Sequence, residues 1–435
     1  MTAKCHSIHD GAGAHSPGAF GRAKHRNPKA ASYGRRVQLQ YDAETERFRA
    51  ELDAWLDEHL PLLAEMRERP PSSAHIPEWA RRWQRSLFDA GWLVPGWPPE
   101  LGGRNATPVQ QMVYFEELAR RQISRTHNIQ GLSIFAPSVI DFGTEEQKEQ
   151  WALPVLRAEK TTCLGMSEPG AGSDLASLTT RAELRGDHFV INGQKVWTSG
   201  AHHADFCICF VRTDPTAPKH KGISVVLVDM STPGITVRPL PGLVNRTLWV
   251  DFNEVLFDNV VVPAENLLGD LNDGWRIANA SLGHERGMLW IWESARLDHT
   301  LELAIAEARR AGDGSSRIGA NGSVRDLLAD AYVDALALRC LGYRGFSKFA
   351  QGKPAPEHML LKLFGSEANQ KLFLGFTEWL GAAALDVETP EDAGRMDDNW
   401  PWVNRYLGSF GTTISGGTSE IQRNIIAERL LGLPR

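Results

Sequence analysis

Residues 165–174 read Gly-Met-Ser-Glu-Pro-Gly-Ala-Gly-Ser-Asp, and residues 192–200 read Asn-Gly-Gln-Lys-Val-Trp-Thr-Ser-Gly. Taken alone, the first stretch fits either a plain loop or a phosphate cradle made of backbone N–H groups. It is not a dinucleotide-binding fingerprint, because a third glycine is missing and no helix is predicted to follow. The second stretch sets an indole beside two hydroxyl groups at the end of a strand. An isoalloxazine ring needs such neighbours, namely a flat apolar face and hydrogen-bond donors along its heteroatom edge.

Short predicted strands surround these two stretches. Residues 188–191 alternate as a strand, Asn192-Gly193 is typical of a hairpin turn, and residues 195–198 form the returning strand. Turn signals separate the strands at short intervals, and no helical pattern lies between them. This arrangement predicts an antiparallel β domain rather than a βαβ unit. The strand pattern continues in the segments 206–211, 223–229, 236–240 and 255–262.

Helical patterns lie on both sides of the predicted β domain. The chain is therefore predicted as α+β, with an N-terminal α-helical domain at 39–160, a central antiparallel β domain at 161–271 and a C-terminal four-helix bundle at 272–435. Before the β domain, helices are predicted at 48–60, 77–90, 108–121, 129–142 and 144–156. After it come predicted helices at 275–301, 324–350 and 356–380, a loop rich in Gly and acidic residues at 386–398, and a last helix from about Thr418 to Leu431.

Composition places the chain among large globular proteins. Of its 435 residues, 42% are hydrophobic and 23% charged, which is enough to bury the cores of two or three domains. The net charge of −6 argues against nucleic-acid binding through bulk charge, and no apolar run is long enough to span a membrane. Residues 1–38 are basic and lack an apolar pattern, which indicates a disordered extension or a start codon assigned too early. A transit peptide fits the same composition less well.

The cysteines indicate a reduced environment. Cys207 and Cys209 are two residues apart in a predicted strand, so both are expected to point to one face. We expect free thiols and a cytoplasmic protein, because thiols stay reduced in that compartment. The spacing of the five residues matches neither a zinc site nor a disulfide framework: Cys5, Cys163, Cys207, Cys209 and Cys340.

The two opening motifs together resemble the flavin site of the acyl-CoA dehydrogenase family. The family's double motif is similar to Met-Ser-Glu-Pro-Gly-Ala-Gly-Ser-Asp followed by Asn-Gly-Gln-Lys-x-Trp-x-Ser. The order of α, β and α domains agrees with that family from about residue 43 onward, as does Gly-Thr-Ser-Glu-Ile-Gln-Arg-Asn at residues 417–424. The resemblance implies the acyl-CoA dehydrogenase fold and an oxidoreductase of lipid metabolism, with FAD as cofactor and an acyl-CoA thioester as substrate.

The resemblance also implies roles for single residues. Ser167 would hydrogen-bond the pyrimidine part of the flavin, Trp197 would cover one face of the ring, and Ser199 would lie near N5. Ser173 would contact the CoA moiety, and Thr418 to Glu420 would touch the diphosphate or ribityl part of FAD. For each residue the alternative is a loop or strand position without a ligand. The residues expected to bind FAD are Leu164, Gly165, Met166, Ser167, Gly172, Ser173, Trp197, Thr198, Ser199, Thr418 and Glu420.

The catalytic base is where this chain departs from many members of the family. Many members place a catalytic Glu two residues before the threonine of the terminal motif, where this chain has Gly416. Glycine cannot abstract a proton, but its N–H could polarise a thioester carbonyl. Other members carry the base on the first helix of the C-terminal domain, where this chain has Glu285. We expect Glu285 to take the α-proton of the substrate, and the alternative is a surface residue paired with Arg286.

Further residues are expected to face the substrate. His284 is expected to be structural or CoA-facing rather than a base, and Arg286 would hold Glu285 in place or meet CoA. Residues 126–135 would form another wall of the acyl cavity, and at least one tryptophan of the 288–292 stretch should belong to an aromatic core. The residues expected to bind the substrate are Ser173, His284, Arg286 and Gly417.

The leading hypothesis is an acyl-CoA dehydrogenase that forms a trans-2-enoyl-CoA and passes electrons to an electron-transfer flavoprotein or a similar acceptor. Relatives imply a homo- or heterotetramer, or a dimer. Two alternatives stay open. Gly416 fits a non-catalytic subunit of a hetero-oligomeric dehydrogenase, and the same scaffold could serve a flavin oxidase or monooxygenase. No motif in the sequence identifies the acyl group.

Overall fold

The computed structural model describes most of the chain after residue 40. The chain divides into two compact units, Met1–Asp42 and Ala43–Arg435, and the architecture below is that of the second. The extension expected at 1–38 and the loop expected at 386–398 lie outside the described residues, as do the side chains of residues 282–289. The described residues are 41–62, 64–68, 70–243, 251–286, 289–310, 322–385 and 401–434.

The N-terminal part is helical, as predicted. Helix α3 begins with a capping box, in which the Thr107 hydroxyl accepts from Gln110 N and the Gln110 side chain accepts from Thr107 N. Pro108 at the first helical position suits this start, because its missing N–H would have no partner there. The helices are α1 (Ala43–His59), α2 (Glu78–Asp89), α3 (Pro108–Arg120), α4 (Ala136–Phe142), α5 (Glu145–Gln147) and α6 (Leu153–Leu156), with π-helical turns at Gly131–Phe135 and Lys148–Ala152.

The middle part forms one eight-stranded sheet in the order β6-β7-β3-β2-β4-β5-β8, with β1 paired to β4. Most neighbouring strands are antiparallel, as expected, but β1 and β2 both pair with β4 in parallel. The loop after β1 is therefore followed by a β2–β3 hairpin before the chain returns beside β1. The strands are β1 (Thr162–Gly165), β2 (Arg181–Arg185), β3 (His188–Lys195), β4 (Phe206–Arg212), β5 (Ile223–Asp229), β6 (Ile235–Pro239), β7 (Asn253–Pro263) and β8 (Leu267–Leu268).

The hairpin turn expected at Asn192-Gly193 was wrong. Strand β3 runs straight through this dipeptide, and its pairing with β7 shifts by one residue there, which is a β-bulge. The turn lies instead at Gly186-Asp187, where Arg185 pairs with His188 and Gly186 has a φ of 63°. Glycine is required at 193 by close packing, since a Cβ there would lie 2.6 Å from the Cα of Thr180.

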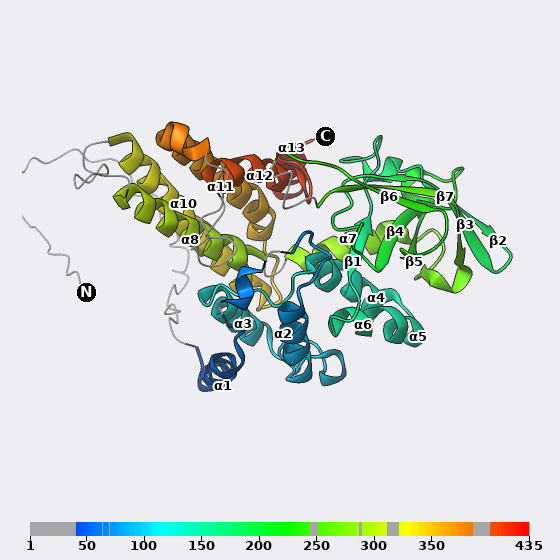
Figure 1. Cartoon of the computed structure of the whole chain (residues 1–435), viewed down its shortest axis with the longest axis horizontal. Coiled ribbons are helices and arrows are strands. Elements are labelled where there is room, and N and C mark those ends of the chain that lie inside the picture. Colours follow the sequence, from blue (N-terminus) through cyan, green and yellow to red (C-terminus); the bar gives the residue numbers. More distant parts are fainter. Residues whose placement is uncertain are drawn as a thin grey trace, which may run out of the picture. The chain divides into compact units, whose positions relative to one another are not determined.

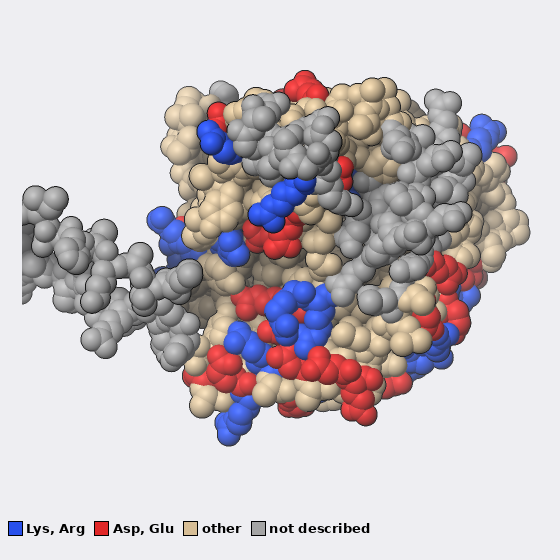
Figure 2. Space-filling model, turned by 60° about the vertical axis from the view of Figure 1, so that its left-hand side comes forward, with Lys and Arg blue, Asp and Glu red and all other residues tan. Residues whose placement is uncertain are grey.

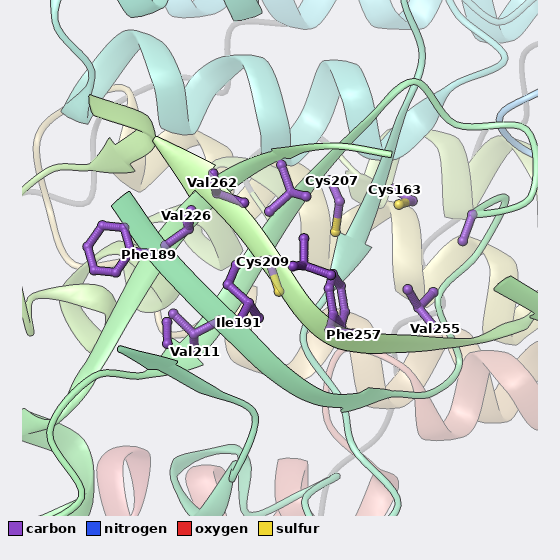
Figure 3. Packing of buried hydrophobic residues seen from close by; sticks show 14 residues of the cluster. Cys163, Phe189, Ile191, Cys207, Cys209, Val211, Val226, Val255, Phe257 and Val262 are labelled. Atoms are coloured by element: carbon purple, nitrogen blue, oxygen red, sulfur yellow. The ribbon is translucent and has the colours of Figure 1, made fainter. Parts of the chain in front are cut away.

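The β domain has a hydrophobic core of its own, a cluster of buried side chains that come mostly from its strands. Figure 3 shows Phe189, Ile191 and Phe257 gathered in this cluster with three cysteines, Cys163, Cys207 and Cys209. These thiols are buried and free, and Cys340 is free and exposed, so the expectation of unpaired cysteines is confirmed for the described part of the chain. The hydrogen bond to Cys163 and burial raise the pKa of Cys207, which makes it a poor nucleophile.

The C-terminal part is again helical. Helix α10 packs against α8 and α11, and α11 packs against α12 (Figure 1). Trp290 belongs to this core, because it is buried and a Cβ on Gly342 would lie 2.1 Å from its ring. The sequence patterns missed α12, and they placed the start of α13 at Thr418, which is its N-cap. The helices are α7 (Gly274–Arg286), α8 (Leu289–Arg310), α10 (Gly322–Phe349), α11 (Glu357–Leu380), α12 (Trp402–Ile414) and α13 (Ser419–Ile425).

The surface carries charges of both signs. On the face drawn in Figure 2, basic and acidic side chains lie next to one another. Ion pairs of this kind join α1 to the end of α3, for example Arg121 to Asp57 at 2.8 Å. Within the described residues, none of the helices has the length and apolarity that a membrane crossing requires.

A buried ion pair fixes the loop after β1 to strand β3. Lys195 Nζ lies 2.8 Å from Glu168 Oε1, and the two side chains are 0% and 4% exposed. The Glu168 carboxylate also accepts hydrogen bonds from the backbone N–H groups of Thr179 at 2.6 Å and Thr180 at 2.9 Å. Lys195 Nζ donates to the carbonyl of Met166 at 3.2 Å. Both buried charges are thus compensated, as burial of a charge requires.

We predict that Glu168→Gln lowers the free energy of unfolding by about 3–5 kcal/mol at neutral pH, because it leaves Lys195 buried without a charged partner. Burial by itself raises the pKa of Glu168, but the Lys195 charge and the hydrogen bonds outweigh it and lower the pKa from 4.5 to about 2. The carboxylate therefore stabilises the fold fully above its unfolded pKa, and this contribution is lost as the pH falls from about 4.5 towards 2. Urea unfolding of both proteins across this range measures the effect.

Glu183→Gln is the matched control, because Glu183 pairs with Arg181 and Arg185 at the surface. It should change the free energy of unfolding little. Equal losses in the two variants, or a difference that does not shrink below pH ~4.5, would contradict the anchoring role of Glu168.

Candidate active site

The loop after β1 and the end of β3 lie side by side. Glu168 and Ala171 exchange two backbone hydrogen bonds of 3.0 Å, which close a tight turn inside the loop. The carbonyl of Ser167 accepts from Val196 N at 2.9 Å, so the loop also bonds to the residue just before Trp197. The structure thus brings together the two groups of residues expected at the flavin, Leu164 to Ser173 and Trp197 to Ser199.

Trp197 has a strained backbone. Its φ is 60°, a left-handed conformation that is rare for a bulky residue and costs on the order of 1–3 kcal/mol. The residue is 60% exposed, and its ring meets that of Phe252 edge to face, with centroids 5.8 Å apart. A strained residue that presents a large apolar ring to solvent is typical of a site where a ligand covers the ring.

Asn253, at the start of β7, holds this strained turn. Its backbone carbonyl accepts from Thr198 N at 3.0 Å, and its side-chain Nδ2 donates to the Thr198 carbonyl at 2.9 Å. The same Nδ2 donates to the carbonyl of Asp251 at 2.7 Å, and that carbonyl accepts from Gly200 N at 2.8 Å. Asn253 is fully buried. One amide group therefore locks both ends of the turn that presents Trp197.

The residues present fit a flavin cofactor. The Thr198 and Ser419 hydroxyl oxygens are buried without a hydrogen-bond partner among the described residues, which is costly unless a ligand or water meets them. Open space surrounds the loop as well, because a Cβ on Gly170 or Gly172 would meet no atom within 4 Å. With the exposed ring of Trp197, these features supply the flat face and hydrogen-bonding groups that an isoalloxazine ring and its side chain need.

The terminal motif lies at the start of α13 and is held by α11. Lys362 Nζ donates to the carbonyl of Gly417 at 2.6 Å, and Gln422 Nε2 donates to the carbonyl of Gly416 at 2.8 Å. Both glycines have positive φ, 64° at Gly416 and 95° at Gly417. The Thr418 hydroxyl caps α13 by accepting from Ile421 N at 3.2 Å. A cavity of about 330 Å³ opens here, lined by Thr418, Ser419 and Glu420 together with Phe410, Ile414 and Arg423.

The expected base lies on α7. Residues 284–286, which include Glu285, form the last turn of α7, and their side chains lie outside the described residues. Helix α7 packs against β5 and against the π-helical turn Gly131–Phe135. That turn follows Asn128, whose side chain bonds both the N–H and the carbonyl of Thr162 in β1. The segment expected to wall the acyl cavity therefore lies between the strand that leads into the flavin loop and the helix of Glu285.

Sequence reasoning missed Asn253 and the partners of Lys195. Lys195 follows Asn192, Gly193 and Gln194, so the sequence did not mark it as buried, although a fully buried lysine almost always has a partner. Asn253 gave no signal, because the contacts it makes join segments about fifty residues apart in the chain.

Asn253→Ala should loosen the strained turn, because the Thr198 and Asp251 carbonyls lose their shared donor. We expect a loss of about 1–3 kcal/mol in the free energy of unfolding, faster hydrogen exchange at Thr198 and Gly200, and weaker FAD binding. Exchange mass spectrometry of peptides spanning 196–201 and titration of the apoprotein with FAD measure these effects.

Asn266→Ala is the matched control, because Asn266 is also buried and its Nδ2 donates to the carbonyl of Leu227 at 3.0 Å. It should cost similar stability without faster exchange at 196–201. Equal exchange in both variants would show that Asn253 does not hold the turn.

The sequence and the fold both match known proteins. Family models for the N-terminal, middle and C-terminal domains of acyl-CoA dehydrogenases match residues 42–159, 163–260 and 272–431. The chain is 35% identical over 396 residues to the acyl-CoA dehydrogenase IpdE1 of Mycobacterium tuberculosis, which covers 90% of this chain and 98% of that protein. It is 40% identical over 354 residues to the acyl-CoA dehydrogenase FadE29 of the same organism, covering 81% and 88%.

Solved structures agree with these matches. The ChsE4-ChsE5 complex from Mycobacterium tuberculosis gives a TM-score of 0.74 at 30% identity, over 92% of this chain and 100% of that chain. A protein described as the Tcur3481-Tcur3483 steroid ACAD gives 0.76 at 31% identity with the same coverage. The three family models follow the same order along the chain as the helical, β and helical parts of the structure. The chain therefore belongs to the acyl-CoA dehydrogenase family, and it is an FAD-dependent flavoprotein oxidoreductase of that family.

Proposed function

We propose that the protein oxidises an acyl-CoA thioester to its trans-2-enoyl-CoA with Glu285 as the catalytic base. The observation that carries this proposal is Gly416, which stands where many family members have the base. It is exposed, and a Cβ built on it would meet no atom within 4 Å. The proton acceptor must therefore come from another element, and α7 offers Glu285 in its last turn.

Gly416 keeps a role through its backbone. Its carbonyl is occupied by Gln422, and among the described residues its N–H has no backbone acceptor. A free N–H can donate to the thioester carbonyl of the substrate. This bond strengthens as negative charge develops on that oxygen, so it makes the α-carbon more acidic.

Glu285 then removes the α-proton. A carboxylate in a pocket that the acyl chain dries has a raised pKa, which suits it to this transfer. When it is bound, FAD supplies the acceptor for the hydride that leaves the β-carbon. Loss of one proton and one hydride balances the formation of the α,β double bond, and we expect an electron-transfer flavoprotein or a similar acceptor to take the electrons onward.

Glu285→Gln should abolish turnover while FAD stays bound, because the amide cannot accept the proton. The assay mixes the yellow protein with a panel of acyl-CoAs and a dye acceptor, with and without air, and follows bleaching at the flavin band. Glu293→Gln on α8 is the matched control and should turn over normally. Fast peroxide formation in air would favour an oxidase or monooxygenase instead.

Placing a carboxylate at position 416 tests the same assignment in a second way. Glu285→Gln combined with Gly416→Glu should recover part of the lost rate, because the space beside Gly416 is open. Recovery should be incomplete, since a side chain at a φ of 64° costs about 1–2 kcal/mol. Full activity of Glu285→Gln alone would overturn the assignment of the base.

A second candidate function is a subunit of a hetero-oligomeric dehydrogenase. Gly416 supports it, and two of the similar solved structures, Tcur3481-Tcur3483 and the ChsE4-ChsE5 complex, are each named for a pair of proteins. Helix α10 also presents apolar side chains to solvent: Tyr332 is 58%, Val333 61% and Leu336 42% exposed. A face of this kind is typical of a surface that another chain covers.

The two candidates differ in what the chain does when it is expressed alone. If this chain holds a complete site, the purified protein should carry about one FAD per chain and oxidise acyl-CoA. A colourless or inert protein that gains flavin and activity only with a second, different chain would favour the hetero-oligomer. Flavin absorbance after denaturation gives the stoichiometry, and sedimentation gives the mass.

A further inference from the structure

Two buried serines join helix α7 to the N-terminal helical part. Ser138 on α4 and Ser281 on α7 are both 0% exposed, and their Oγ atoms lie 2.6 Å apart. Each hydroxyl also lies within hydrogen-bond distance of the carbonyl four residues earlier, that of Ile134 at 2.6 Å and that of Ile277 at 2.8 Å. The contact therefore connects two helices through polar groups that water does not reach.

The serine pair contributes little to stability. Each serine alone could donate its one hydrogen to the carbonyl four residues earlier, as serines in helices often do. An O–O distance of 2.6 Å requires a hydrogen between the two oxygens, so one serine gives up that bond to reach the other. Replacing both hydroxyl groups by apolar groups would be nearly neutral. A polar contact of this length has one good geometry, so it fixes the register of two helices more sharply than an apolar contact does.

Other contacts of α7 are less directional. At its start, the Arg276 guanidinium lies over the ring of Phe142, 4.7 Å from the centroid. Ile277 is fully buried. Gly274 allows a close approach to β5, since a Cβ there would lie 2.8 Å from the carbonyl oxygen of Ile223. These contacts hold the first turn of α7 against its neighbours, and the serine pair fixes the helix further along.

The serine pair connects the helix of the proposed base to the segment expected to wall the acyl cavity. Position 285 lies one turn after Ser281, and residues four apart share a face of an α-helix. Ser138 follows the turn Gly131–Phe135 and reaches the carbonyl of Ile134 inside that turn. A slide of α7 by one residue would move position 285 by about 1.5 Å along the helix axis. The same slide would break the contact between the two hydroxyl groups.

We propose that Ser138 and Ser281 are positioning residues, which hold α7 in the register that places Glu285 at the α-carbon of the substrate. This inference rests on the proposed function, because it concerns the base of that reaction. A displacement of about 1 Å at a reacting group can lower a rate about 100-fold. Loss of the pair lowers kcat, whereas FAD and substrate, which are expected to meet other residues, bind as before.

The test measures turnover of the holoenzyme with the acyl-CoA that the wild type oxidises fastest among butyryl-, isobutyryl-, octanoyl- and palmitoyl-CoA. Ser138→Ala, Ser281→Ala and the double variant should each lower kcat about 10-fold with KM and FAD content unchanged. The double variant should lose no more than the single ones, because all three remove the same bond. Deuterium at the α-carbon of the substrate should slow the variants more than the wild type, since proton abstraction limits their rate.

Ser409→Ala is the matched control, because Ser409 is also buried and its Oγ donates to the carbonyl of Tyr406 at 2.6 Å within α12. It should leave kcat and the isotope effect unchanged, and all alanine variants should unfold at similar urea concentrations. If an alanine variant fails to fold, Ser281→Thr is compared with Ser281→Val. The two side chains have the same shape, so a kcat about 10-fold higher for the threonine reports on the hydroxyl alone.

The outcomes separate the serine pair from the proposed function. Unchanged kcat in the alanine variants, or equal kcat of Ser281→Thr and Ser281→Val, overturns the positioning role and leaves the proposed function standing. Absence of turnover in the wild type removes the proposed function, and hydrogen exchange of peptides spanning 274–286 then decides on the pair. Faster exchange in the double variant than in wild type and Ser409→Ala supports a register fixed by the serines, and equal exchange overturns it.

Discussion

The ion pair between Lys195 and Glu168 is the interaction on which the site depends. It joins the loop after β1 to the end of β3, which are the two segments that the family motif comprises. The residue after Lys195 bonds the carbonyl of Ser167, so the pair also sets the distance between the loop and Trp197. An apolar contact could bury the same area, but it would not fix the orientation of the loop relative to β3. A buried charge pair with additional backbone donors is satisfied in one geometry, because any shift of the loop leaves a charge without its partner.

Around this pair, the site contains two backbone segments with positive φ. Gly416 and Gly417 adopt theirs without steric cost, and Lys362 and Gln422 hold their carbonyls. Trp197 is different, because a tryptophan in this conformation is strained and persists only when its surroundings force it. Asn253, at the start of β7, holds this conformation through the hydrogen bonds of its side-chain amide. The large ring is therefore held in place before any ligand binds, and less entropy is lost on binding.

In our proposal, two elements share the work of activating the substrate. Gly416 has no side chain, so its backbone N–H polarises the thioester carbonyl, and Glu285 on α7 removes the α-proton. The segment from Arg125 to Asn128 connects the helical domain with β1 through the side chain of Asn128. This segment and the loop after β1 are held by different contacts, because the loop is anchored independently by Lys195. A shared scaffold with variable walls is how one fold serves many substrates.

The sequence by itself determined the family, the order of helical and β parts, and most helices and strands, because periodicity and a long double motif are local in the chain. It also placed the flavin motif in a loop and a strand end that the structure brings together. It could not determine the path through Asn192-Gly193, since a dipeptide typical of turns was overridden by pairing with β7 and by the close approach of Thr180. Nor could it find Asn253, or the partners of the buried Lys195. Those are properties of contacts between distant segments, and burial decides their energy only once the chain has folded.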